Sequence, residues 1–178
     1  MGDKVGLKRT THRMPEPFPS PRVLVTAGAT REPIDDVRFI GNRSSGRLGV
    51  ALADEAARLG LDVTLAAGRP VHITDTCPAT TLRFDSTADL QGLLGSGMPD
   101  VDILVMAAAV ADHAPTRVPG KLEAISGQAI TLELHPTPDL LAEVSRSARH
   151  DQLLVGFALE PSERLEPSAR RKLERKRV

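Results

Sequence analysis

The sequence predicts an α/β fold, namely an open, doubly wound, mostly parallel sheet of Rossmann-like type with helices on both faces. Short apolar runs alternate with amphipathic helical patterns along the 178 residues, which is the order of repeated βαβ units. The first apolar run, Val23 to Val25, is typical of a strand that is buried on both faces. Both observations favour a parallel sheet covered by helices.

Each element has its own signal. The spacing of Leu48, Leu52, Ala56 and Leu59 predicts a helix, and Gly60 marks its end. Apolar runs and alternation predict the strands, whereas the glycines and the proline of residues 95–99 end the second helix. We expect strands at 22–26, 62–66, 80–84, 101–106, 129–134 and 153–158, and helices at 48–59, 87–94, 140–147 and 168–178.

Composition divides the chain and excludes some classes of protein. Residues 1–22 are basic and then rich in proline, which predicts a disordered lead or linker before a folded domain at 23–178. Lys+Arg and Asp+Glu both number 23, so net charge gives no case for nucleic-acid binding. No apolar run reaches about 18 residues, so we expect no membrane span. Cys77 is the single cysteine, and a reducing, cytoplasmic location is the default expectation.

A long polar loop after the first strand is the strongest functional signal. It holds Arg31, Arg38 and Arg43 and is longer than the usual βα connection. It ends in Ser44-Ser45-Gly46 and Gly49, and small residues at a helix start leave backbone N–H groups open to an anion. The pattern favours a phosphate or carboxylate site. The alternative is that the two glycines only permit close packing of helix on sheet.

Other candidates have equally plausible structural explanations. Asp112 follows small residues at a strand end. There it can accept hydrogen bonds from ribose hydroxyls or hold a metal-bound water, or it can simply cap a turn. Lys121 lies in an irregular flap that can close over phosphates, although single lysines are usually solvated. Lys172 and Lys176 share a helix face that suits a triphosphate or solvent. Arg69 ends the second strand and is compatible with the 2′-phosphate of NADP.

The stretch TAGATREPIDDVRFIGNRSSGRLG resembles the signature of phosphopantothenoylcysteine synthetase, an enzyme of coenzyme A biosynthesis. In many bacteria that domain is the second half of a bifunctional flavoprotein. Ala108 to Asp112 resemble the family's second signature, and Pro138-Asp139 resemble its nucleotide-binding turn. His113 and Thr137 depart from the family pattern, as do the residues after Lys121. The resemblance extends from Val23 to the last residue, and the family's C-terminal segment is expected to be missing.

The resemblance implies roles for particular residues. It gives catalytic roles to Asn42 and Lys121. It gives substrate or phosphate binding to Gly28, Arg38, Ser44, Ser45, Gly46 and Gly49. It gives nucleotide contacts to Ala108, Asp112, Lys121, Pro138, Asp139, Leu140, Leu141, Phe157, Lys172 and Lys176. The sequence contains no Cys/His cluster, so we expect no metal that is held by protein ligands alone.

The implied reaction joins 4′-phosphopantothenate and cysteine through an acyl-nucleotidylate. CTP is the expected cosubstrate, with ATP possible, and Mg²⁺ accompanies the triphosphate. The family also implies a homodimer and a flavin-dependent decarboxylase partner. Two alternatives stay open, a non-catalytic subunit or fragment that binds nucleotide or phosphopantothenate, and an NADP-dependent reductase. The absence of tyrosine argues against the reductase, because it excludes a Tyr-x-x-x-Lys pair.

Overall fold

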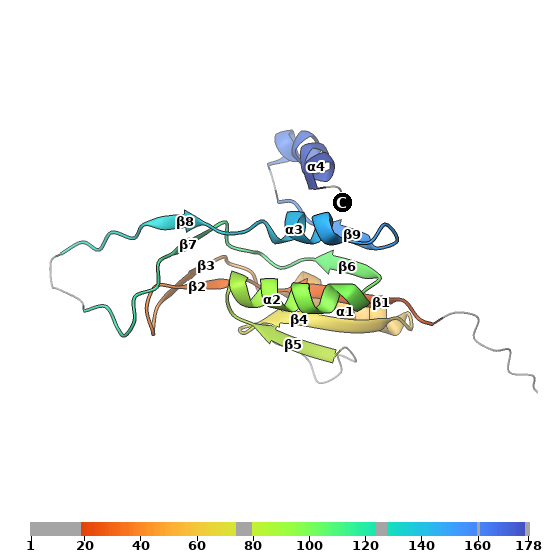
Figure 1. Ribbon diagram of the computed structural model, residues 1–178, viewed down its shortest axis with the longest axis horizontal. Coiled ribbons are helices and arrows are strands. Elements are labelled where there is room, and N and C mark those ends of the chain that lie inside the picture. The colour runs from red at the N-terminus through yellow and green to blue at the C-terminus, as the bar shows by residue number, and fades with distance from the viewer. Residues whose placement is uncertain (1–18, 74–79, 124–127, 160, 177–178) are drawn as a thin grey trace, which may run out of the picture.

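A five-stranded parallel sheet forms the centre of the molecule (Figure 1). The computed structural model describes residues 19–73, 80–123, 128–159 and 161–176. Cys77 and almost all of the predicted lead lie outside this range. The strands are β1 (Arg22–Ala27), β4 (Asp62–Gly68), β5 (Thr80–Phe84), β6 (Ile103–Met106) and β9 (Leu153–Gly156), in the order β5-β4-β1-β6-β9. The predicted doubly wound parallel sheet is confirmed.

Helices cover both faces of this sheet. Val23 and Val25 of β1 pack with Ala53 of α1 (Arg47–Arg58) on one face. Leu24 points to the other face, where it joins side chains of α2 (Thr87–Gly97) and α3 (Leu140–Ser147) in a second cluster. The 3₁₀ turn η1 (Met98–Asp100) follows α2, and α4 (Ser162–Lys176) stands beside α3 (Figure 1). The alternation along β1 is what a strand buried on both faces requires.

Two short antiparallel pairs extend from one end of the sheet (Figure 1). The long loop after β1 contains β2 (Arg31–Pro33) and β3 (Phe39–Gly41), joined by a turn of residues 34–38. β7 (His113–Pro115) pairs with β8 (Leu134–Pro136) at the base of an arm, which we define as residues 116–133. The sequence did not predict β2, β3 or β7, because three residues are too few to show a period.

Six predicted elements differ from the structure by two residues or more. Two of them need only a small change, because β4 continues to Gly68 and β6 begins at Ile103 rather than at 101. The strand at 129–134 is wrong, because β8 begins only at Leu134, where the partner strand β7 is available. The second helix continues to Gly97, because Leu94 and Met98 bury their side chains and outweigh the glycine propensities. The last strand ends at Gly156, and Phe157 beyond it is 52% exposed. The last helix begins at 162 rather than 168 and contains Pro167.

No helix within the described residues combines the length and the apolar character needed to cross a bilayer.

Candidate functional site

The direction of winding changes between β1 and β6. From β1 the chain proceeds outward to β4 and β5, and it then returns to build β6 and β9 on the other side. In open α/β sheets ligands bind beyond the carboxyl ends of the strands at this point. The long loop after β1 and the alanine-rich loop after β6 both start there.

Backbone hydrogen bonds hold these two loops side by side. Ala109 N donates to Gly28 O at 2.7 Å, and Thr30 N donates to Ala109 O at 3.2 Å. Ala108 N donates to the hydroxyl of Thr26, a fully buried residue of β1, at 3.0 Å. The predicted site residues Gly28 and Ala108 are thus brought together by pairing that prolongs the sheet.

Glycines at the end of β1 and at the start of α1 allow very close packing. Gly28 and Gly46 have φ of 91° and 76°, in the left-handed region, and a Cβ on either would clash with Val71. A Cβ on Gly49 would lie 2.6 Å from Ala27 Cβ. The packing role that the sequence allowed for Gly46 and Gly49 is confirmed, and anion binding by the same turn stays a prediction.

The first turn of α1 has no side-chain cap. Gly46 is the N-cap, and no acidic residue stands in the first turn. The first helical hydrogen bond runs from Val50 N to Gly46 O at 3.0 Å. Ser44 is half-buried and Ser45 is exposed just before the turn. Uncapped N–H groups and the positive end of the helix dipole make this turn suitable for an anion.

A third loop meets the first two. The side-chain amide of Asn42 donates to Val110 O at 3.1 Å. Thr137 N donates to Asp112 O at 3.0 Å, and the Thr137 hydroxyl donates to Ala111 O. Asn42, the 108–112 segment and the 137–139 turn therefore converge. The Asp112 carboxylate is exposed and makes no hydrogen bond or ion pair within the described part of the chain.

A buried polar network beneath these loops was not predicted. Glu32 Oε1 accepts hydrogen bonds from Thr87 N at 3.0 Å and from the Thr87 hydroxyl at 2.7 Å. The Thr30 hydroxyl lies 3.2 Å from the Thr87 hydroxyl and accepts from Ala111 N at 2.9 Å. The network ties the start of α2 to the alanine-rich loop. No local pattern marks it, because its members are far apart in the sequence.

Lys121 and Arg38 lie at the arm and the β2–β3 turn. The Lys121 ammonium is exposed and has no partner among the described residues. The guanidinium of Arg38 lies 3.2 Å from Asp35 Oδ2 and donates to Leu122 O at 3.2 Å. Arg38 is therefore already paired within the chain. Asp35 is a further residue that the sequence did not single out, although adjacent aspartates in a loop are a signal for side-chain-stabilised turns.

The predicted nucleotide-binding residues after the arm have different surroundings. Pro138 is exposed, whereas Leu140 is buried in the core cluster. Leu141 is half-buried and packs against Gly156 of β9. Phe157 follows that strand and is exposed. Two of these side chains thus contribute to packing, and nucleotide contact by any of the four stays a prediction.

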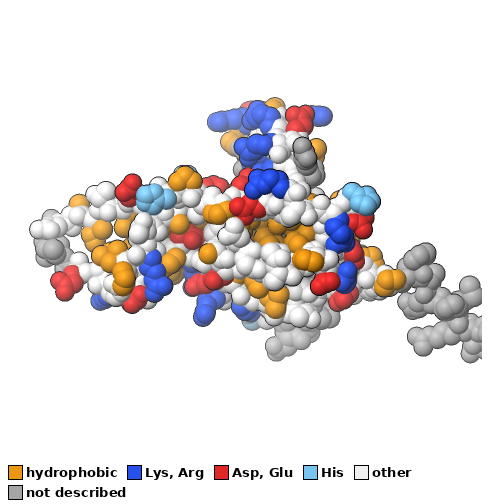
Figure 2. Space-filling view, in the orientation of Figure 1, with side chains coloured by type: hydrophobic (Ala, Val, Ile, Leu, Met, Phe, Trp, Pro, Cys, Tyr) orange, Lys and Arg blue, Asp and Glu red, His pale blue; other side chains and the backbone are white. Residues whose placement is uncertain are grey.

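Basic side chains gather on α4 (Figure 2). Lys176 Nζ lies 2.8 Å from Asp139 Oδ1, and Arg175 lies 3.8 Å from Asp139 Oδ2. Asp139 is also the N-cap of α3 and accepts from Ala142 N. Partial burial opposes ionisation of Asp139, but Lys176, the Ala142 N–H and Arg175 together lower the pKa of its carboxyl. Lys176 and Asp139, both predicted to contact nucleotide, form an ion pair with one another, and Lys172 lies one turn before Lys176.

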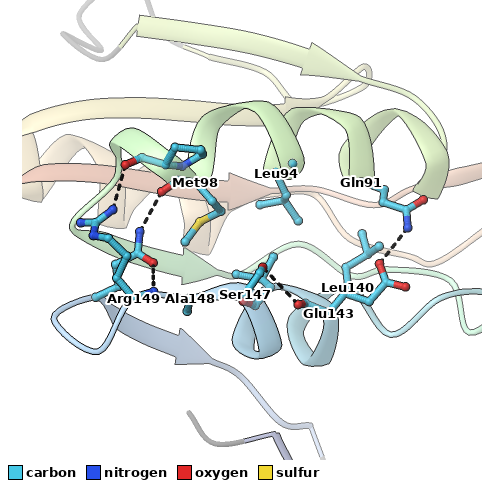
Figure 3. A pocket seen from close by; sticks show the side chains of 12 residues that line it. Gln91, Leu94, Met98, Leu140, Glu143, Ser147, Ala148 and Arg149 are labelled. Carbon is cyan, nitrogen blue, oxygen red and sulfur yellow. Dashed lines mark hydrogen bonds between the residues drawn. The ribbon is translucent and has the colours of Figure 1, made fainter.

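A groove of about 450 Å³ lies elsewhere, between α2 and α3 (Figure 3). Its floor includes Leu94 and Met98. Its polar groups are already paired: Gln91 Nε2 donates to Glu143 at 2.7 Å, and Arg149 Nη1 donates to Pro99 O at 2.8 Å. We assign no ligand to it. Across the described ranges no three His, Cys, Asp or Glu side chains gather closely enough to hold a metal ion.

Comparisons with known proteins bear on the same residues. Residues 19–178 match the family model "DNA/pantothenate metabolism flavoprotein C-terminal domain". A coenzyme A biosynthesis bifunctional protein CoaBC from Mycobacterium bovis is 46% identical over 145 residues, covering 78% of this chain and 35% of the relative. A cysteine/cysteine sulfinic acid decarboxylase from an unknown prokaryotic organism is 40% identical over 164 residues, covering 92% and 45%.

A solved structure, the C-terminal domain of a CoaBC protein, matches with a TM-score of 0.74 and 35% identity. The match covers 89% of this chain and 74% of that one. The chain spans less than half the length of the two curated relatives named above. On the family model and these identities, the chain belongs to the family of DNA/pantothenate metabolism flavoprotein C-terminal domains.

Proposed function

We propose that this chain is a phosphopantothenate–cysteine ligase of coenzyme A biosynthesis. It joins 4′-phosphopantothenate to cysteine through an acyl-nucleotidylate formed from CTP. The uncapped first turn of α1 carries the proposal, because it follows the Asn42 loop, which is hydrogen-bonded to the 108–112 segment at the switch point of the sheet. The CoaBC relatives support the same assignment.

The residues suit an acyl transfer that needs positioning and charge stabilisation more than a protein nucleophile. The carboxylate of phosphopantothenate attacks the α-phosphate of CTP and pyrophosphate leaves. The cysteine amine then attacks the activated carbonyl, and CMP leaves. Asn42 is an amide donor for the oxyanion, the α1 turn binds substrate phosphate, and Lys121 balances charge on the triphosphate.

The donor set fits Mg²⁺ carried by the nucleotide. Mg²⁺ in such sites is held by one or two carboxylates together with substrate phosphates. Asp112 supplies one exposed carboxylate, unpaired within the described ranges, beside the converging loops, and it alternatively accepts hydrogen bonds from the ribose hydroxyls. When bound, the ion neutralises phosphate charge.

Pyrophosphate release tests the proposal directly. The wild type is incubated with Mg²⁺ and CTP or ATP, with and without 4′-phosphopantothenate and cysteine. We expect release that requires phosphopantothenate, is faster with CTP, and yields phosphopantothenoylcysteine when cysteine is added. Asn42→Asp should lower the rate roughly 10²- to 10³-fold, because it replaces an oxyanion donor by a negative charge. Glu55→Gln, which loses only an exposed α1 ion pair, is the control.

Two other results would replace this proposal. Nucleotide binding without pyrophosphate release from the folded chain would favour a non-catalytic subunit. NADPH binding tighter than CTP binding would favour a reductase with Arg69 at the 2′-phosphate. Arg69 is exposed, with Nε 4.0 Å from Asp85 Oδ2.

We also propose that the chain forms a homodimer through the arm. Ile130 and Leu132 of the arm and Leu134 at the start of β8 alternate along the chain and are exposed, and hydrophobic side chains gather there in Figure 2. Exposed alternating apolar side chains favour pairing with another chain. Analytical ultracentrifugation should give a dimer for the wild type and a monomer for Leu132→Asp. A monomeric wild type would contradict the dimer.

A decarboxylase partner follows from the names of the relatives, one a bifunctional protein and one a decarboxylase. We propose that a flavin-dependent decarboxylase uses the product, either fused to this chain or separate. Conversion of phosphopantothenoylcysteine to its decarboxylated product by a coupled extract would support it.

A further inference from the structure

The turn between β2 and β3 is bound tightly to residues 117–122, which begin the arm. Two backbone bonds link them, Asp36 N to Gly120 O at 2.9 Å and Val118 N to Ile34 O at 2.9 Å. The Asp36 carboxylate also accepts from Gly120 N at 3.1 Å and from Arg117 at 2.8 Å. A segment that is remote in the sequence is thereby held along the acidic turn.

Asp35 is the centre of this contact. Its Oδ1 accepts from Val37 N at 2.8 Å and from Arg38 N at 2.6 Å, within its own turn. Its Oδ2 accepts from Leu122 N at 3.0 Å and lies 3.2 Å from Arg38 Nη1. The side chain is 0% exposed. One oxygen therefore builds the turn and the other holds the arm.

The electrostatics favour the charged form of this carboxyl. Burial raises the pKa of Asp35, but the three backbone N–H donors and the Arg38 guanidinium outweigh burial and lower it. Arg38 adds a second link, because its Nη2 donates to Leu122 O at 3.2 Å. The anchor is thus a charged pair, and hydrogen bonds to charged groups are stronger than neutral ones.

Lys121 stands between the two anchored amides of Gly120 and Leu122. Its backbone is held from both sides, while its ammonium is exposed and has no partner within the described residues. We propose that Asp35 is a positioning residue that presents Lys121 to the triphosphate. This inference rests on the proposed function. Anchoring the backbone leaves only side-chain freedom to be lost when a phosphate binds.

Asp35→Asn separates the two oxygens of Asp35. The amide oxygen still accepts from Val37 N and Arg38 N, so the turn is retained. The amide NH₂ faces the Leu122 N–H and Arg38, so the link to the arm is lost. We expect kcat/KM for CTP to fall roughly 10- to 100-fold. Amide exchange should accelerate at Gly120 and Leu122, and not in α1.

A double-mutant cycle with Lys121→Ala gives the decisive readout. If Asp35 acts through Lys121, Asp35→Asn causes no further loss when Lys121 is already alanine. Asp36→Asn, which affects only exposed contacts, should show the same non-additivity and serves if Asp35→Asn does not fold. Glu55→Gln should leave activity unchanged.

The outcomes distinguish the role of Asp35 from the proposed function. Losses from the Asp35 and Lys121 variants that simply multiply would overturn the inference while the proposed function stands. A folded wild type that releases no pyrophosphate would overturn both. A non-additive cycle with faster exchange at Leu122 would support both.

Discussion

The first turns of α1 and α2 begin at the same edge of the sheet and are satisfied in opposite ways. α2 has a complete capping box between Ser86 and Asp89, and Glu32 accepts from Thr87 N. α1 has Gly46 as its N-cap, no side-chain cap and no acid in its first turn. The chain's own oxygens accept from the first N–H groups of α2, whereas no side chain caps the first N–H groups of α1. The contrast supports the proposal that the start of α1 binds an anion, whereas the start of α2 contributes to stability.

The largest expected effect comes from filling the close contact at α1. Gly49→Val should lower the free energy of unfolding by about 3 kcal/mol, because its Cβ would lie 2.7 Å from Thr26 O and 2.6 Å from Ala27 Cβ. Urea unfolding measures it. Gly92→Ala in α2 is the matched control, because nothing lies within 4 Å. It should raise stability by about 0.5 to 1 kcal/mol. Equal effects would contradict the packing argument.

Removing the acceptor that Glu32 provides at the start of α2 should have the next largest effect on stability. Glu32→Ala leaves the buried Thr87 N–H and hydroxyl without their acceptor, which should cost about 2 kcal/mol. Glu32→Gln keeps an acceptor oxygen and should lose much less. Chemical denaturation of both variants tests this, and an equal loss would show that burial of the side chain, not the hydrogen bonds, matters.

The capping box of α2 should contribute less. Ser86→Ala removes the acceptor for Asp89 N, a bond of 3.1 Å, and should cost about 1 kcal/mol in the same denaturation assay. Ser45→Ala, just before α1, should change stability very little, because no side chain caps that helix. A comparable loss at Ser45 would mean that α1 is capped after all.

The capping box should also respond to pH. The Ser86 N–H is the main cause of the lowered pKa of Asp89, partial burial opposes it, and the Ser86 hydroxyl, the Asp85 N–H and Arg69 assist. A lowered folded-state pKa stabilises above the unfolded value, near 3.8, and the gain is lost as pH falls through the lower folded value. The stability difference between wild type and Asp89→Ala should therefore shrink below about pH 4. A constant difference would contradict a charged cap.

The sequence predicts best those elements whose hydrophobic pattern repeats over several residues. α3 and β5 have the predicted bounds, and α1 differs by one residue at each end. The sequence does not predict β2, β3 or β7, because each has only three residues and is defined by the strand with which it pairs. Asn42 and Gly28 can be picked out because they stand in one continuous signature. Glu32 and Asp35 stand in the same signature, but their partners Thr87 and Leu122 are far along the chain, and only the fold reveals them.

An acid at the start of α1 should have the smallest effect on stability. Arg47→Glu puts an acid in the first turn of α1, where the helix dipole favours it, and should raise stability by about 0.3 to 1 kcal/mol. The same carboxylate should weaken binding of inorganic pyrophosphate in calorimetry, because it occupies the field that attracts the anion. Arg47→Gln separates loss of the cation from gain of the acid. If pyrophosphate binds both variants as it binds the wild type, the anion does not sit at the start of α1. A gain in stability together with weaker binding of this anion would support the view that α1 has no side-chain cap because a bound anion accepts from its first N–H groups.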